Sequence, residues 1–215
     1  MSRRDELARK LRQITGWPNL TFDLNGQLRL GTESPIAGSK SARDLIARVV
    51  HGQEVVVVED VSGSSEVAFC RVVPGAWKDS NSSAPPAHVV QIDFTDFEHV
   101  VGDREALRAF DVGWGFLHEL DHIANDSADA VSQAHAGECE SHINQMRREC
   151  SVPQRADYFF TFLPVPVDSV FVSRLVRMAF EQEPTQARKK KRYWLVWDAT
   201  LVGGLNDRKE IAWVR

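Results

Sequence analysis

Apolar residues recur at two spacings along the chain, and the spacing predicts which segments are helices and which are strands. Recurrence at three and four positions indicates amphipathic helices, whereas alternation at every second position indicates half-buried strands. Helices are predicted over residues 4–15, 41–50, 112–125, 137–150 and 168–180, with a further one that Asp103 caps and that includes Leu107. Strands are predicted over residues 21–30, 54–59, 66–73, 88–94, 158–165 and 193–199.

Turn residues separate these elements. Asn25-Gly26 favours a tight turn, so residues 21–30 are expected to form a β-hairpin around it. The stretch Pro74–Pro86 is rich in serine, proline and asparagine and is predicted to be a loop. Most strands precede the two long central helices, which indicates an α+β fold. We expect one domain over residues 1–215, with residues 1–50 as a possible helix and hairpin appendage.

The composition narrows the class of protein. Of 215 residues, 43% are hydrophobic and 26% are charged, as in a globular protein that can bury a sizeable core without disulfides. The net charge of −4 gives no general attraction to nucleic acid or to anionic membranes. No apolar run approaches the roughly 20 residues that cross a membrane.

The first residues and the cysteines indicate where the protein acts. Met1–Lys10 is strongly charged and lacks the apolar core of a signal peptide. The three cysteines, Cys70, Cys139 and Cys150, form no CxxC pair and fit a reducing compartment. The expected location is therefore the cytoplasm, although secretion through a specialised system would leave no trace in these features.

The most informative motif is His118-Glu119-Leu120-Asp121-His122, an HExxH sequence. Residues four apart lie on one face of a helix, so His118 and His122 can hold one metal ion together. Glu119 lies about 100° further round the helix, where its carboxylate can act as general base toward a water at the metal. The motif predicts a zinc-dependent hydrolase of the zincin type with Zn²⁺ as its cofactor.

The surrounding residues favour this interpretation over a chance occurrence. The residues from Phe110 to Asn125 include no proline, and an apolar stripe is formed by Phe116, Leu117, Leu120, Ile123 and Ala124. That stripe is expected to pack inward while the two histidines face another direction. The alternative, two ordinary surface or core histidines, fits a loop or an irregular segment better than this helix.

A third ligand is expected because catalytic zinc usually has three protein ligands and a water. Glu140 shares an i, i+4, i+7 stripe with Asn144 and Arg147, so the three side chains are expected to face the same way. We predict Glu140 as the third ligand. Glu138 is the second candidate for this ligand, and His142, Asp126 and Asp129 are further alternatives. An acid that is not a ligand would simply stabilise the N-terminus of its helix.

A family resemblance supports a site of this kind. Its residues are Glu140-x3-Asn144-x2-Arg147-x-Glu149-x2-Val152-Pro153-x-Arg155-x2-Tyr158, after the HELDH sequence. The run is similar to one in bacterial HExxH proteins and in metallopeptidase domains of Rhs-type toxins. The chain also resembles gluzincins, in which the third ligand is a glutamate about 20 residues after the second histidine. The resemblance covers about Leu117–Tyr158 and implies a small antiparallel or mixed sheet beside the HExxH helix and a second, ligand-bearing helix.

Other side chains are candidates for supporting roles. Asp121 or Asp126 could accept the free N–H of a metal-bound histidine. Arg155 or Tyr158 could stabilise an oxyanion from the strand side, and we include Tyr158 with Glu119 as a catalytic residue. The competing interpretation makes Tyr158 an aromatic residue that begins a buried strand.

Two further features are expected to be structural. The basic run Arg188–Arg192 is predicted to be a solvated turn between the helix at 168–180 and the last strand, and Trp194 and Trp197 belong to the core or a cleft wall. Neither favours a nucleic-acid partner over a peptide or protein substrate.

The sequence as a whole predicts a zinc metallopeptidase. Glu119 would activate water and His118, His122 and Glu140 would hold the zinc. One alternative is a zincin-like binding module with structural zinc or none, which a fourth protein ligand would favour. Another is a toxin or effector protease that acts on a single host protein.

Overall fold

The computed structural model describes residues 1–77, 87–132, 136–165, 173–182 and 190–204. The helices are α1 (Arg3–Thr15), α2 (Lys40–His51), α3 (Phe94–Glu98), α4 (Arg104–Ala109), α5 (Val112–Asn125) and α6 (Glu138–Glu149). The first five strands are β1 (Thr21–Phe22), β2 (Leu28–Arg29), β3 (Val55–Asp60), β4 (Cys70–Trp77) and β5 (Ala87–Ile92). The others are β6 (Val101–Gly102), β7 (Gln154–Arg155), β8 (Thr161–Phe162), β9 (Leu175–Gln182) and β10 (Lys191–Asp198).

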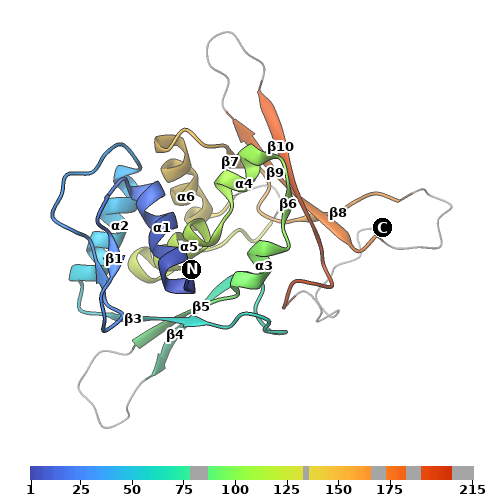
Figure 1. Ribbon diagram of the computed structural model, residues 1–215. Coiled ribbons are helices and arrows are strands. Elements are labelled where there is room, and N and C mark those ends of the chain that lie inside the picture. Colours follow the sequence, from blue (N-terminus) through green and yellow to red (C-terminus); the bar gives the residue numbers. More distant parts are fainter. Residues whose placement is uncertain (78–86, 133–135, 166–172, 183–189, 205–215) are drawn as a thin grey trace.

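The fold mixes helices and small sheets, as the α+β prediction requires. Helix α5, which carries the HExxH motif, packs against α1, α2 and α6 and against strands β4 and β5 (Figure 1). Its residues Phe116, Leu117 and Leu120 are buried in a core shared with the other helices. Residues 1–50 contribute Leu7, Leu11 and other side chains to that same core, so α1 and α2 pack directly on the motif helix.

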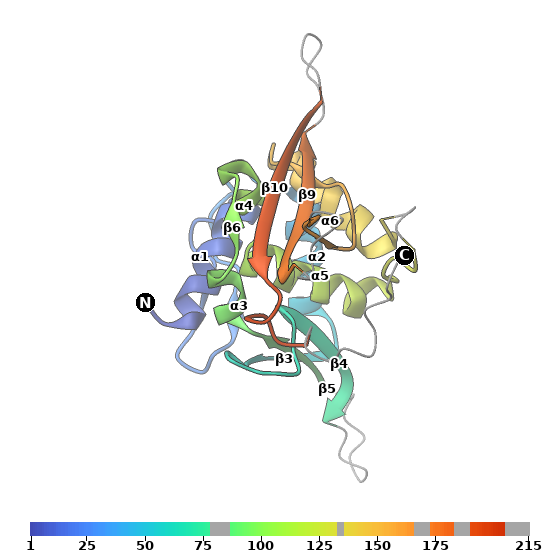
Figure 2. The ribbon, with the colours of Figure 1, turned by 90° about the vertical axis from the view of Figure 1, so that its right-hand side faces the viewer.

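Two sheets flank this helical group. The first has the order β3-β5-β4, with β3 parallel and β4 antiparallel to β5. The second is antiparallel with the order β6-β10-β9-β7, and β8 also pairs with β9. In Figure 2 the long β9–β10 pair runs across the face of the molecule above the first sheet. The two strands β1 and β2 form the hairpin predicted around Asn25-Gly26.

Local signals explain where the helices begin and end. Ser2 and Asp5 form a capping box at the start of α1, and Gly16 ends the helix in the left-handed conformation. Asp111 caps α5 by accepting hydrogen bonds from the N–H groups of Gly113 and Trp114. No helix in the described ranges is both long enough and apolar enough to cross a membrane.

The prediction of a helix over residues 168–180 is wrong for residues 173–180, the part that the structure describes. Residues 175–182 form strand β9, which pairs with β10 from Leu175 to Gln182. The side chains of Val176, Met178 and Phe180 are all buried, which is the alternation of a strand. Ala179 is also buried and interrupts that alternation, so the apolar run has no clear period by itself. Residues 166–172 lie outside the described residues.

Several boundaries also differ from the prediction. Strand β4 extends to Trp77, into the segment predicted as a loop, and its register with β5 shifts between Val73 and Trp77. Lys191 and Arg192, predicted in a turn, belong to β10, whereas residues 183–189 lie outside the described part. Tyr158 precedes the short strand β8 and does not begin it.

Candidate metal centre

The two histidines of the motif lie on one face of α5. Their ring centroids are 4.8 Å apart, as expected for neighbours one helical turn apart. The side chains keep small exposed fractions, 13% for His118 and 17% for His122, so one side of each ring is accessible. The apolar stripe on the opposite side anchors the helix in the core and holds this face in place.

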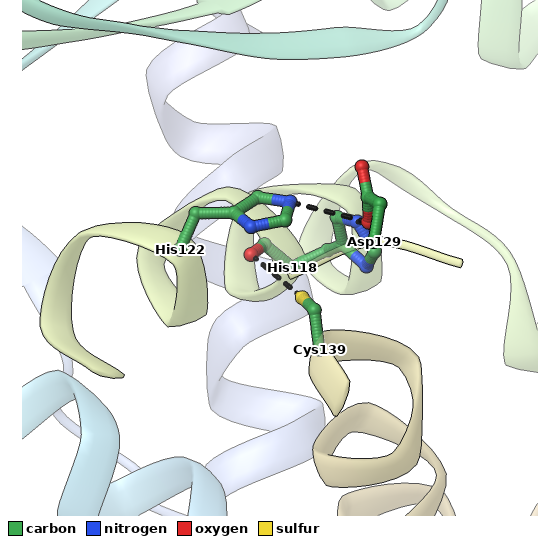
Figure 3. Close-up of side chains that lie close together, drawn as sticks. All are labelled: His118, His122, Asp129 and Cys139. Carbon is green, nitrogen blue, oxygen red and sulfur yellow. Dashed lines mark hydrogen bonds and ion pairs between the residues drawn. The ribbon is translucent and has the colours of Figure 1, made fainter. Parts of the chain in front are cut away.

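Both rings point at the same carboxylate, that of Asp129 (Figure 3). The Nε2 atom of His118 lies 3.0 Å from Asp129 Oδ1, and the Nε2 atom of His122 lies 3.4 Å from the same oxygen. Asp129 was among the ligands that the sequence left open. The structure therefore brings together two imidazole nitrogens and one carboxylate oxygen, supplied by α5 and by the loop that follows it.

The first residues after α5 are held against that helix and against the start of α6. Helix α5 ends at Asn125, and the next residue, Asp126, caps it in the left-handed conformation with φ 51°. Asp129 forms a backbone bridge with Gly137, and the carbonyl of Ala128 accepts hydrogen bonds from the N–H groups of Glu138 and Cys139. A Cβ atom on Gly137 would lie 2.4 Å from the nitrogen of Ala130, so only glycine permits this close approach. The start of α6 thus positions Asp129.

Glu140, the predicted third ligand, lies on the other side of His118. Its Oε2 atom is 3.5 Å from Nδ1 of His118, the ring nitrogen that faces away from Asp129. Such a contact orients a ligating imidazole and fixes which nitrogen carries the proton. For His122 the same role belongs to the carbonyl of Ser127, 2.8 Å from Nδ1.

Glu140 is buried in a network of charges. Its side chain is 1% exposed and forms ion pairs with Arg147 and, at 3.2 Å, with Arg155. Burial by itself would raise the pKa of Glu140, but the two guanidinium groups hold it well below its usual range. Asn144 donates to the carbonyl of Arg155 and accepts from Arg147, so the predicted stripe does face the interior. This network fixes Glu140 beside His118.

Glu119 lies near the two histidines but outside the group of side chains that could hold a metal among the described residues. Its side chain is 7% exposed, and burial raises the pKa of its carboxyl group, against the opposing effect of His118 and His122. The backbone N–H of Val72 in β4 is close enough to the carboxylate to lower its pKa slightly. A buried carboxyl group with a raised pKa beside two imidazoles is suited to take up and release a proton.

Tyr158 and Arg155 both reach the centre. The Tyr158 hydroxyl is close enough to Asp129 to be affected by its charge, and the Tyr158 ring lies 6.3 Å from that of His118 in a stacked arrangement. Arg155 places its guanidinium 4.6 Å from the centroid of the Tyr158 ring. Burial and the nearby Asp129 charge raise the pKa of Tyr158, which stays protonated and can donate a hydrogen bond.

A thiol completes the group. The Sγ atom of Cys139 lies within 4.8 Å of ligand atoms of His118, His122 and Asp129. The side chain is fully buried and donates a hydrogen bond to the carbonyl of His118. In Figure 3 it approaches from α6, on a different side of the histidines from Asp129. Cys139 was not among the ligands predicted from the sequence.

The other acids and the third histidine near the motif lie elsewhere. Asp121 is fully buried and accepts hydrogen bonds from His142, Ser127 and Asn125, so it organises the loop and contacts no ring of the motif. Asp126 is exposed at the end of α5, and Glu138 is exposed on α6. These positions are outside the group of side chains that could hold a metal in the described residues.

The charges at the centre predict that binding of a metal such as Zn²⁺ there would depend on pH. The hydrogen bond to Asp129 raises the pKa of His122 to about 11, and the same carboxylate raises the pKa of His118 well above its ordinary value. These raised values favour the protonated rings at neutral pH in the metal-free protein. A metal requires neutral rings, so its binding must release protons.

We therefore expect the apparent zinc affinity to rise by about tenfold per pH unit for each proton released, throughout pH 7–8.5. The zinc affinity at each pH can be measured by competition with a chromophoric chelator at fixed ionic strength. Histidines with ordinary pKa values near 6.5 would already be neutral and would give an affinity independent of pH in this range. Asp129→Asn removes the partner that raises the pKa values and should flatten the dependence.

Comparison of the chain with protein-family models, with curated proteins and with solved structures found no match.

Proposed function

We propose that the protein is a zinc-dependent hydrolase that cleaves peptide bonds, in which His118, His122 and Asp129 hold the metal and Glu119 is the general base. The observation that carries the proposal is the convergence of two Nε2 atoms on one oxygen of Asp129. We propose Asp129 in place of Glu140 as the third ligand. Glu140 then acts by orienting His118.

The donor atoms fit zinc in type and in spacing. Two imidazole nitrogens and one carboxylate oxygen form the ligand set of many catalytic zinc sites. Donor atoms bound tetrahedrally at about 2.0–2.1 Å lie about 3.3 Å from one another. The separations of 3.0 and 3.4 Å from Asp129 to the two rings match this value. The chemistry that zinc supplies when bound is to acidify a water and to polarise a carbonyl group.

The side chains around the centre can perform the remaining steps. Glu119 is one residue from His118 and can take the proton of the attacking water, then return it to the leaving amine. Tyr158 has its hydroxyl beside Asp129 and can donate a hydrogen bond to the oxyanion of a tetrahedral intermediate. Arg155 packs on the Tyr158 ring and holds it in place.

The arrangement of β4 favours a peptide as the substrate. In the described residues β4 pairs with β5 alone, so its other edge is unpaired. That edge faces the centre, since the N–H of Val72 reaches Glu119. An extended peptide can add to such an edge as a further strand, and this would bring its backbone past the general base. The open edge therefore supports a peptidase over other hydrolases.

The test of the proposal is the metal content together with cleavage of peptides. The purified protein should contain about one zinc per chain, measured by mass spectrometry, and should cleave peptides from a mixed library. His118→Ala and His122→Ala should each lose the metal and the cleavage. Protein that is metal-free after purification without chelators and takes up no added zinc would contradict the proposal.

The position of Cys139 supports a second candidate function, a closed structural zinc site. Four protein ligands leave no position for water, and such sites stabilise folds without catalysis. If Cys139 is a ligand, Cys139→Ala should weaken zinc binding strongly and lower the unfolding temperature of the zinc-bound protein. If the thiol only donates to the carbonyl of His118, the same variant should keep its zinc and its activity.

A further inference from the structure

A cavity of about 220 Å³ borders the candidate metal centre. One part of its wall carries His118, Glu119 and Tyr158. Much of the rest is aromatic, with Phe69, Phe97, Phe110, Trp114, Phe160 and Trp197, and the ion-paired Glu140, Arg147 and Arg155 also line the cavity. Apolar cavities of about 150 Å³ are large enough to bind benzene. This cavity can therefore hold an aromatic ring directly beside the proposed general base.

The aromatic wall is built around Phe69. Its ring centroid lies 5.2 Å from that of Phe97, 5.1 Å from that of Phe110 and 5.5 Å from that of Trp197, in tilted or edge-to-face geometry. The backbone of Phe69 has φ 61°, an unfavourable value for a residue with a bulky side chain. The buried carboxylate of Asp96 holds this conformation by accepting from the N–H of Phe69 at 2.8 Å. The wall is thus maintained against a conformational cost.

Gly115 on α5 lets two residues of the cavity wall, Cys70 and Phe97, pack closely against the helix. It lies three and four residues before His118 and Glu119, on the same face of the helix. A Cβ atom at this position would lie 2.9 Å from Sγ of Cys70 and 3.0 Å from Cζ of Phe97. Glycine is unfavourable within a helix. Here its missing side chain lets Phe97 and Cys70 stay in place, and a methyl group would push them toward the cavity.

Trp197, in the cavity wall, has an indole N–H that donates no hydrogen bond within the described residues. The residue is 1% exposed. Buried indole N–H groups normally find a partner. An acceptor on a molecule that occupies the cavity, such as the hydroxyl of a tyrosine side chain, would provide one.

We propose that this cavity is a specificity pocket that binds an aromatic side chain of the peptide, adjacent to the bond that is cleaved. The proposal rests on the hydrolase function proposed above. It assigns the substrate class, peptides with tyrosine or phenylalanine at one position beside the cleaved bond.

The first test is independent of zinc. p-Cresol, which carries the side chain of tyrosine, should bind the metal-free protein with a Kd of about a millimolar or tighter and shift the indole N–H resonance of Trp197 in the NMR spectrum. Gly115→Ala should weaken this binding about tenfold or more. Gly113→Ala is the matched control, because its Cβ would be equally crowded, 2.9 Å from Lys10, but against α1 and away from the cavity. No binding, or equal weakening by both variants, would overturn the pocket.

The second test uses cleavage by the zinc-loaded protein. Peptides that differ at one position should show kcat/KM roughly 10- to 200-fold higher for tyrosine or phenylalanine than for alanine. Gly115→Ala should reduce this ratio, and Gly113→Ala should keep it. Cleavage without an aromatic preference would overturn the inference and leave the hydrolase function intact. Binding of p-cresol without cleavage of any peptide would overturn the hydrolase function and retain the aromatic site.

Discussion

Glu119→Gln is expected to abolish hydrolysis while the protein keeps its zinc. Glutamine has nearly the same shape but cannot take a proton from water, and removal of a general base costs about 10²–10⁴-fold in rate. The histidine nitrogens and Asp129 are untouched by the change. Zinc content by mass spectrometry and kcat/KM on a cleaved peptide together measure the result.

The surroundings of Glu119 make this variant a fair test. The backbone N–H of Val72 lies close enough to act on the carboxylate, and the side-chain oxygen of glutamine can face the same N–H. The fold around β4 should therefore persist, which circular dichroism can verify. If the variant loses zinc as readily as His118→Ala does, Glu119 is a ligand and the proposed division of roles is wrong.

Asp129→Ala is expected to lower zinc affinity by more than about 100-fold, the upper range for residues that only support a ligand. The reason is that the variant removes the one oxygen on which both Nε2 atoms converge. Glu138→Ala is the matched control, because Glu138 is an exposed acid near the same loop and outside the metal-binding group. The zinc affinity of Glu138→Ala should be unchanged within about twofold, since the only expected role of Glu138 is a weak stabilisation of the helix N-terminus.

Glu140 should respond differently from Asp129. Glu140→Gln leaves Arg147 buried without its charged partner, and breaking such a pair costs about 3–5 kcal/mol of folding stability. Zinc affinity should fall by only about 10- to 100-fold, through the loss of orientation of His118. The opposite pattern, in which Glu140→Gln loses zinc completely and Asp129→Ala retains it, would restore Glu140 as the third ligand.

The local features of the centre could be predicted from sequence because they depend on neighbouring residues. The HExxH spacing places His118 and His122 on one helical face, and Asp111 at its start caps that helix. Glu140, Asn144 and Arg147 share an inward face of α6, as their spacing indicates. The Asn25-Gly26 dipeptide likewise predicts the hairpin of β1 and β2. In each case the relevant contacts are between residues a few positions apart.

Strand β9 shows where local patterns are insufficient. Its buried residues Val176, Met178 and Phe180 alternate, but Ala179 is buried too, and a short apolar run of this kind fits a helix or a strand. The segment forms a strand because it pairs with β10 along its whole length. Lys191 and Arg192 belong to β10 for the same reason, although their charge favours a turn.

The sequence alone predicted a helix that carries two histidines on one face with Glu119 beside them. Only the tertiary structure decided which acid faces the ring nitrogens. Asp129 lies seven positions after His122, and the chain leaves the helix after Asn125, so helical geometry cannot predict the approach. The loop returns to the histidines because Gly137 permits its close contact with the start of α6. Arg147 and Arg155 meanwhile hold Glu140 on the opposite side of His118, since a buried carboxylate requires positive partners.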